Sequence, residues 1–63
     1  MVTYFQVETF YKNGTSVKAN FTKFSAARQL YWNTLKSAAK MKVQSVCLWC
    51  MQEDEVCLVL LYA

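Results

Sequence analysis

The cysteines are the residues of this chain whose type and spacing most suggest chemistry. Cys47 and Cys50 have the spacing of a CxxC motif, and Cys57 follows them. A redox CxxC lies at a helix N-terminus, where the dipole lowers the thiol pKa, and a zinc-binding CxxC lies on a tight turn. Here the motif falls in an apolar run typical of a strand, which directs Cys47 and Cys50 to opposite faces. We expect reduced, packing thiols that bind no metal and no cofactor.

The remaining ionisable residues do not suggest a catalytic site. The chain has no histidine, so a general base near neutral pH would have to be a shifted carboxylate, lysine or thiol. Three of the four acids are consecutive, at 53–55, and such side chains do not converge on one ion. They suit a solvated hairpin tip that discourages edge pairing. We expect no enzymatic activity and no small-molecule substrate.

The basic residues lie together in the middle of the chain, because residues 11–42 contain all seven and no acid. This charge suits a polyanion or an acidic protein surface, although a small apolar-rich domain also needs charge for solubility. On a helical wheel, Trp32 lies one turn from both Arg28 and Lys36. It either stacks on a base or anchors an interface, or it folds down over the sheet edge. The candidate surface for an anionic partner is Lys12, Lys18, Arg28, Trp32, Lys36 and Lys40.

Length and hydrophobic periodicity predict one small α+β domain. The chain has 63 residues, 56% of them hydrophobic, with no proline and one glycine, which argues against disorder. Alternation predicts strands at about 2–11, 15–21, 43–51 and 56–62, and a 3.6-residue period predicts a helix at about 24–42. No apolar run approaches the ~20 residues that span a bilayer, and the N-terminus does not resemble a signal peptide. We therefore expect a cytoplasmic protein without membrane contact.

The Asn-Gly turn at 13–14 predicts the first hairpin and its register. A two-residue loop would place apolar residues of the second strand beside polar residues of the first. A type I turn with the glycine as a left-handed bulge residue instead pairs Phe5 with Phe21. It also places Glu8 across from Lys18. The matching of apolar faces favours the bulged hairpin.

The second hairpin brackets the acidic tip, and both of its faces are apolar. With 53–54 as the loop, Cys50 faces Cys57 and Leu48 faces Val59. Facing cysteines on antiparallel strands can form a strained, reducible disulfide under oxidation. One helix covers only one face. The aliphatic face, expected beneath the helix, comprises Val46, Leu48, Cys50, Cys57, Val59 and Leu61. The opposite face comprises Cys47, Trp49, Met51, Val56, Leu58, Leu60 and Tyr62.

The element order ββαββ predicts a four-stranded sheet with one helix packed on one face. A strand that is apolar on both faces belongs in the middle, so we expect the last strand beside the first, in the order 2-1-4-3. In element order, the chain resembles the β-grasp architecture of streptococcal immunoglobulin-binding domains. The resemblance covers that order only and implies no function.

The uncovered sheet face is the predicted working surface. We expect a non-catalytic interaction protein that forms a homodimer or binds a host protein. Short chains of this kind are often accessory factors of phages or mobile elements, including inhibitors of host defence systems. The alternative is a small nucleic-acid-binding protein that uses the basic helix face and Trp32. The predicted partner interface is Tyr4, Phe10, Trp49, Leu58, Leu60 and Tyr62.

Overall fold

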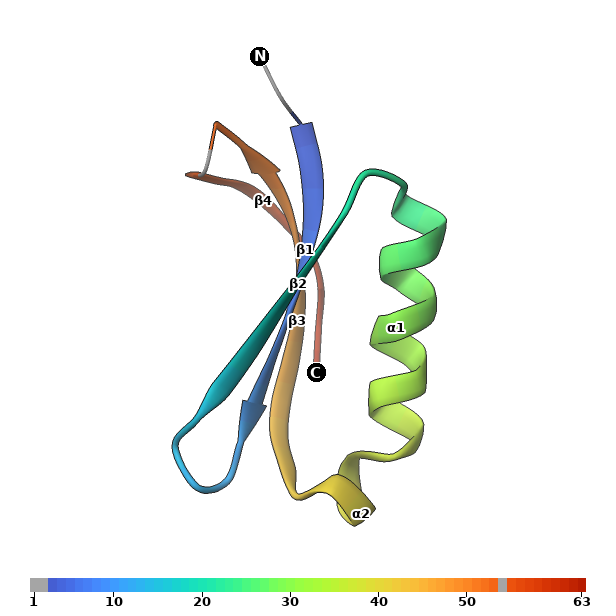
Figure 1. Ribbon diagram of the computed structural model, residues 1–63, viewed down its shortest axis with the longest axis vertical. Helices are drawn as coiled ribbons and strands as arrows, with labels where there is room; N and C mark the ends of the chain where they lie inside the picture. The colour runs from blue at the N-terminus through green and yellow to red at the C-terminus, as the bar shows by residue number, and fades with distance from the viewer. Residues whose placement is uncertain (1–2, 54) are drawn as a thin grey trace.

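The protein is described by a computed structural model that covers residues 3–53 and 55–63 (Figure 1). Over these residues a four-stranded antiparallel sheet carries one main helix, which confirms the predicted α+β class. The predicted strand start at residue 2 and residue 54 of the acidic tip lie outside the described residues. The elements are β1 (Thr3–Tyr11), β2 (Ser16–Phe21), α1 (Phe24–Lys36), α2 (Ala38–Met41), β3 (Val43–Gln52) and β4 (Glu55–Tyr62).

The strand order is β2-β1-β3-β4, so the expected order 2-1-4-3 is wrong. The resemblance to β-grasp architecture therefore does not extend to the sheet. β3 lies beside β1 and pairs with it from Thr3–Gln52 to Tyr11–Val43. Both strands of the second hairpin are apolar on both faces, so apolar content could not decide which one is central. β3 is the longer strand and pairs along all of β1 with one register shift near Tyr11, whereas the ladder between β3 and β4 shifts twice.

The first hairpin has the predicted bulged register. Phe5 pairs with Phe21, and Glu8 lies across from Lys18. Gly14 has a φ of 91°, a conformation that L side chains rarely adopt, and its N–H donates to the Tyr11 carbonyl at 3.1 Å. The tight turn thus aligns the apolar faces of β1 and β2.

The core lies between α1 and one face of the sheet. Ala27 and Tyr31 of the helix pack against Val7 of β1 and against Val46 and Leu48 of β3, and all five side chains are buried. The helical spacing of the two α1 residues brings them to the same side of the helix. Burial of these groups supplies the main apolar contribution to folding.

The helix predicted at 24–42 is divided into α1 and α2. The division occurs at Ser37, whose φ of −103° and ψ of 8° leave the helical region. α2 ends at Lys42, which adopts a left-handed conformation with φ of 57°. This turn redirects the chain into β3 at the lower end of the view in Figure 1.

The register of the second hairpin differs from the prediction. Gln52 pairs with Glu55 next to the turn, as predicted, but the ladder then shifts at two bulges within the described part of β3 and β4. A bulge adds one residue to a strand without a partner of its own. The predicted pairs Cys50–Cys57 and Leu48–Val59 are therefore wrong, and the observed pairs are Cys50–Leu58, Trp49–Val59, Leu48–Leu61 and Cys47–Tyr62.

These bulges also move side chains of β4 between the two faces. Val59 was expected beneath the helix, but it pairs with Trp49 on the opposite face. Leu58 pairs with Cys50 on the helix side, and Leu60 packs against the core there, although both were expected on the uncovered face. Because both faces of this hairpin are apolar, a shift of register carries little energetic penalty and leaves no mark in the sequence pattern.

Candidate interaction surface

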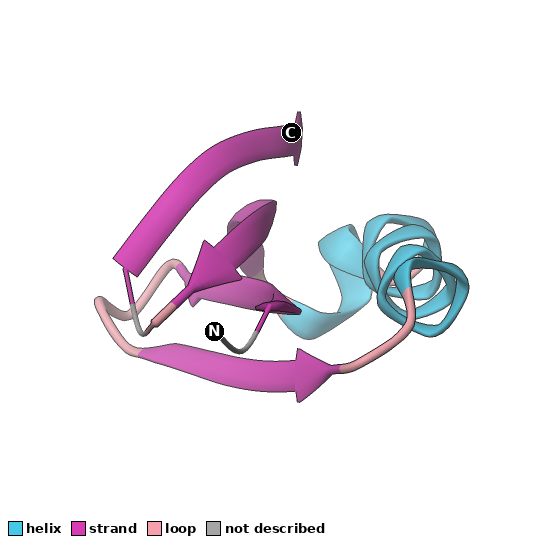
Figure 2. Cartoon of the chain, turned by 90° about the horizontal axis from the view of Figure 1, so that it is seen from above, coloured by secondary structure: helices cyan, strands magenta, loops and turns pink. Residues whose placement is uncertain are grey.

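β4 is the strand least covered by the rest of the protein. α1 packs chiefly over β1, β3 and β2. Seen from above, β4 forms a side of the molecule that lies apart from α1 (Figure 2). Its place at the end of the strand order also leaves its outer edge unpaired within the described chain. The exposed residues of this strand other than Glu55, here called the β4 surface, are Val56, Cys57, Leu58, Val59 and Tyr62.

The β4 surface is apolar and highly exposed. Val56 and Val59 are 50% and 48% exposed, Leu58 is 57% exposed, and Tyr62 is 70% exposed. The register assigns Val56, Val59 and Tyr62 to the face opposite α1, and Leu58 to the helix side. β4 therefore presents apolar groups on both faces, which is uncommon for a soluble monomer.

The outer edge of β4 offers backbone groups for pairing. The N–H and C=O of Ala63 both bond to Val46, at 3.0 and 2.9 Å. In an antiparallel ladder adjacent residues alternate in direction, so the N–H and C=O of Tyr62 point away from β3. Edge strands are commonly protected by lysine or proline, and β4 contains neither. This edge is open to another strand.

The predicted partner interface is only partly assembled by the fold. Tyr4, Phe10, Trp49 and Tyr62 lie on the face opposite α1, and all but Tyr62 are half-buried. Leu58 is exposed on the other side of the strand, and Leu60 contributes to the core. The exposed Val56 and Val59 were not among the predicted interface residues. For Val59 no signal existed, because the bulge that turns it outward is not visible in the pattern.

Trp49 carries an unsatisfied polar group beside this surface. Its indole N–H is buried and meets no acceptor among the residues that the structure describes. The neighbouring Gln6 uses its amide to donate to Asn20 Oδ1 at 3.0 Å. A buried donor without an acceptor costs about 1–3 kcal/mol. This unsatisfied indole N–H belongs to a residue on the sheet face opposite α1.

The three thiols lie in different environments. Cys47 is fully buried, and burial, together with the nearby negative charge of Glu8, raises the pKa of its thiol. The thiolate that a nucleophile or metal ligand requires is therefore disfavoured at neutral pH. Cys50 is half-buried and pairs with Leu58, whereas Cys57 is exposed and is the residue without a partner at the neighbouring bulge. Within the described residues, no three His, Cys, Asp or Glu side chains are grouped as a metal site.

Of the residues predicted to bind an anionic partner, those on α1 form a short row and the others lie apart from it. Arg28, Trp32 and Lys36 line a shallow hollow on the outward side of α1, together with Ser25, Gln29 and Asn33. Trp32 is 49% exposed and packs edge-on against Tyr31, with ring centroids 5.5 Å apart. Lys12 lies in the first hairpin turn, Lys18 lies on β2 across from Glu8, and Lys40 lies in α2. The fold brings together the three residues of α1 but not Lys12 and Lys18.

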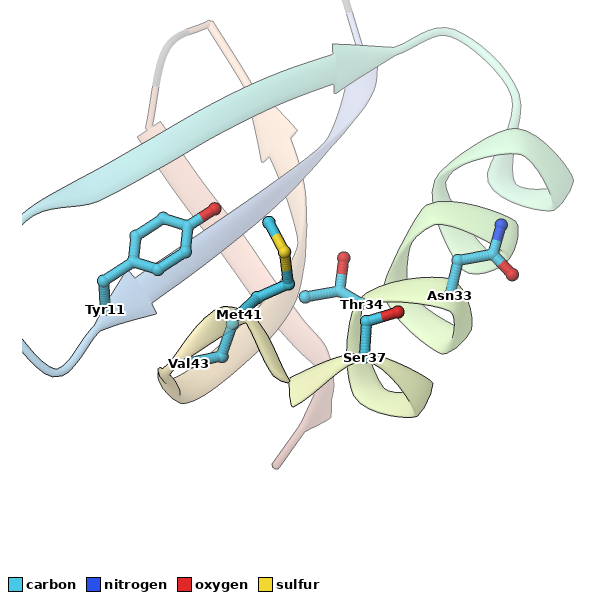
Figure 3. A pocket seen from close by; sticks show the side chains of 6 residues that line it. All are labelled: Tyr11, Asn33, Thr34, Ser37, Met41 and Val43. Carbon is cyan, nitrogen blue, oxygen red and sulfur yellow. The ribbon is translucent and has the colours of Figure 1, made fainter. Parts of the chain in front are cut away.

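The break between α1 and α2 leaves a small cavity of about 230 Å³. Figure 3 shows the Tyr11 side chain on one side of it and the Thr34 and Ser37 side chains on the other, with Met41 between them. Asn33 and Val43 complete the lining. Pockets for small-molecule ligands usually measure about 300–1,000 Å³. The cavity is smaller than that range and follows from the local break in the helix.

No helix among the described residues is long and apolar enough to cross a membrane. A comparison with protein-family models found no match, and searches of curated proteins and of solved structures found none either. The fold and the surface together define a small α+β protein with an uncovered apolar edge strand.

Proposed function

We propose that this protein is a non-enzymatic interaction module whose working surface is the β4 surface. The observation that carries the proposal is the exposure of one apolar strand on both faces and along its edge. Exposed apolar patches of this kind mark interaction sites in soluble proteins. The partner is a second copy of the chain or a host protein. The latter fits a short accessory factor of a phage or mobile element that inhibits a host defence system.

The energetics favour a partner on this strand. Complete burial of a Val or Leu side chain contributes about 1.5–3 kcal/mol. Val56, Leu58 and Val59 are each about half exposed, so covering them contributes roughly 1 kcal/mol apiece. A domain of this size is stabilised by only about 5 kcal/mol in total. Covering β4 is therefore a substantial contribution on the scale of the whole fold.

A matched pair of substitutions tests the proposal. Leu58 on β4 and Val17 on β2 lie on opposite edge strands and are both 57% exposed. Wild-type protein and the Leu58→Glu and Val17→Glu variants are used for pull-down from the native host, with nuclease treatment. We expect partner capture by wild type and Val17→Glu, and its loss in Leu58→Glu. Equal capture by all three proteins would remove β4 as the working surface.

A second candidate function is nucleic-acid binding through α1. It is favoured by the row of Arg28, Trp32 and Lys36, in which an exposed ring lies between two cations. A base stacked on Trp32 would make Trp32→Ala cost about 1–3 kcal/mol of binding. Replacing Lys36 and Lys40 by Glu would abolish such binding.

Gel shifts with single-stranded and duplex DNA and RNA at two salt concentrations distinguish the two candidates. Counterion release makes non-specific binding fall steeply with salt. We expect weak retention that disappears near physiological salt. Submicromolar binding under those conditions would favour the nucleic-acid function instead.

A further inference from the structure

We infer that the β4 surface is occupied by a second copy of this chain, through antiparallel pairing of the two β4 strands into one continuous sheet. This inference rests on the proposed function and specifies its partner. A two-fold axis perpendicular to the sheet brings identical edges together with antiparallel strands. Both copies of α1 then lie on the same side of the joined sheet.

The open backbone groups of β4 suit this pairing. Tyr62 directs its N–H and C=O outward, as the bonds between Ala63 and Val46 require. Strand addition at such an edge supplies main-chain hydrogen bonds, and the side chains of alternate residues make the cross-strand contacts. Val59 and Leu58 lie near the middle of the strand, on opposite faces. The partner strand therefore meets apolar groups on each face.

The distribution of charge favours the antiparallel arrangement over a parallel one. Glu55 begins β4 and is the strand's one charged residue. Parallel pairing in register would place Glu55 beside its own copy, which is repulsive. Antiparallel pairing instead places it near the Tyr62 end of the partner strand, where β4 is uncharged.

The two ends of the molecule are also complementary in charge. The β3–β4 turn, with Glu53 and Glu55, and the segment containing α2, with Lys40 and Lys42, lie at opposite ends (Figure 1). Lys42 immediately precedes β3, at the end of the sheet toward which β4 runs. The two-fold axis moves the acidic turn of each copy toward the basic end of the other. Attraction between these ends opposes the repulsion of two chains that each carry a charge of +3.

The other edge of the sheet is less suitable for self-pairing. β2 carries Lys18, and a lysine on an edge strand is a common protection against pairing. α1 also covers β2 on one face, where Phe21 packs against the core. β4 has neither protection. The β4 edge is therefore the one suited to self-pairing.

The oligomeric state tests the inference directly. Light scattering after gel filtration at micromolar concentration is expected to give a dimer for wild type and for Val17→Glu. Leu58→Glu is expected to be monomeric, because the two-fold axis brings two introduced carboxylates close together. A wild-type monomer would overturn the inference, and so would a Leu58→Glu dimer.

A second pair of variants tests the backbone pairing without adding charge. Tyr62→Pro removes an N–H that points outward, so the bonds between β3 and β4 remain. Tyr62→Ala removes the same side chain and keeps the N–H. We expect Tyr62→Pro to weaken the dimer more than Tyr62→Ala, with circular dichroism confirming that both are folded. Equal dimerisation of the two variants would exclude pairing at this edge.

A charge exchange tests the orientation. A Lys40→Glu/Lys42→Glu variant and a Glu53→Lys/Glu55→Lys variant are each expected to dimerise more weakly than wild type, because antiparallel pairing then brings ends of like charge together. An equimolar mixture of the two is expected to recover association. A Lys40→Glu/Lys42→Glu variant that dimerises as strongly as wild type would contradict the antiparallel arrangement, because parallel pairing already places ends of like charge side by side in wild type. Failure here is distinguishable from failure of the proposed function. A monomeric wild type whose host-protein capture is lost in Leu58→Glu would reject self-pairing and retain the interaction function.

Discussion

At the scale of single residues, Cys47 and Tyr31 are neutral groups held in the interior. Burial raises the pKa of both side chains; Glu8 raises that of Cys47 further, and Cys47 raises that of Tyr31. Both groups lose their protons more readily in the unfolded chain, which therefore binds fewer protons at alkaline pH. The free energy of unfolding should fall as the pH rises above about 9. Urea denaturation at neutral pH and at pH values above this point measures the effect. A Cys47→Ala/Tyr31→Phe variant should show a flatter dependence, and an unchanged slope would contradict this assignment.

The cysteines differ in how much they contribute to packing. Cys47 is completely buried, whereas Cys57 is exposed on β4. Cys47→Ala should lower the free energy of unfolding by about 1 kcal/mol, through lost packing and a small cavity. Cys57→Ala is the matched control and should change it by less than about 0.5 kcal/mol. Equal losses in the two variants, measured by chemical denaturation, would contradict the burial difference.

At the scale of the elements, the end of α2 is a place where a residue other than glycine adopts a strained backbone conformation, as Glu53 also does in the β3–β4 turn. Lys42 has a φ of 57°, in the left-handed region where glycine is favoured. Lys42→Gly should therefore raise the free energy of unfolding, by about 0.5–1 kcal/mol. Lys40→Gly, within α2, should instead lower it by about 1 kcal/mol, because the residue there is helical. Thermal denaturation shows whether each substitution raises or lowers the stability. A lower midpoint for Lys42→Gly would show that the left-handed conformation at this position does not favour glycine.

At the scale of the whole molecule, the stability should depend on protein concentration. Association of two folded copies stabilises the native state by mass action, so the midpoint of thermal unfolding rises with concentration. The exposure of Leu58 and Tyr62 makes a β4-mediated dimer the expected source of this effect. Differential scanning calorimetry over a concentration series should show the rise for wild type and not for Leu58→Glu. A midpoint that is constant for wild type would argue against association.

Local pattern by itself determined the first hairpin and the class of fold. β1 and β2 have one apolar face each, so only one register matches Phe5 with Phe21, and Gly14 supplies the positive φ that this register needs. The periodicity also identified α1, because Ala27 and Tyr31 recur at helical spacing and both are buried. In these segments the local preference and the tertiary environment agree.

Only the tertiary structure decided the arrangement of the second hairpin. Its strands are apolar on both faces, so several registers and either strand order bury similar apolar surface. Contact with β1 and α1 makes β3 central, and the bulges turn Val59 outward and direct Leu60 toward the core. The apolar character of both faces of the hairpin was therefore readable from the sequence, whereas which residues form the β4 surface depended on packing between distant segments.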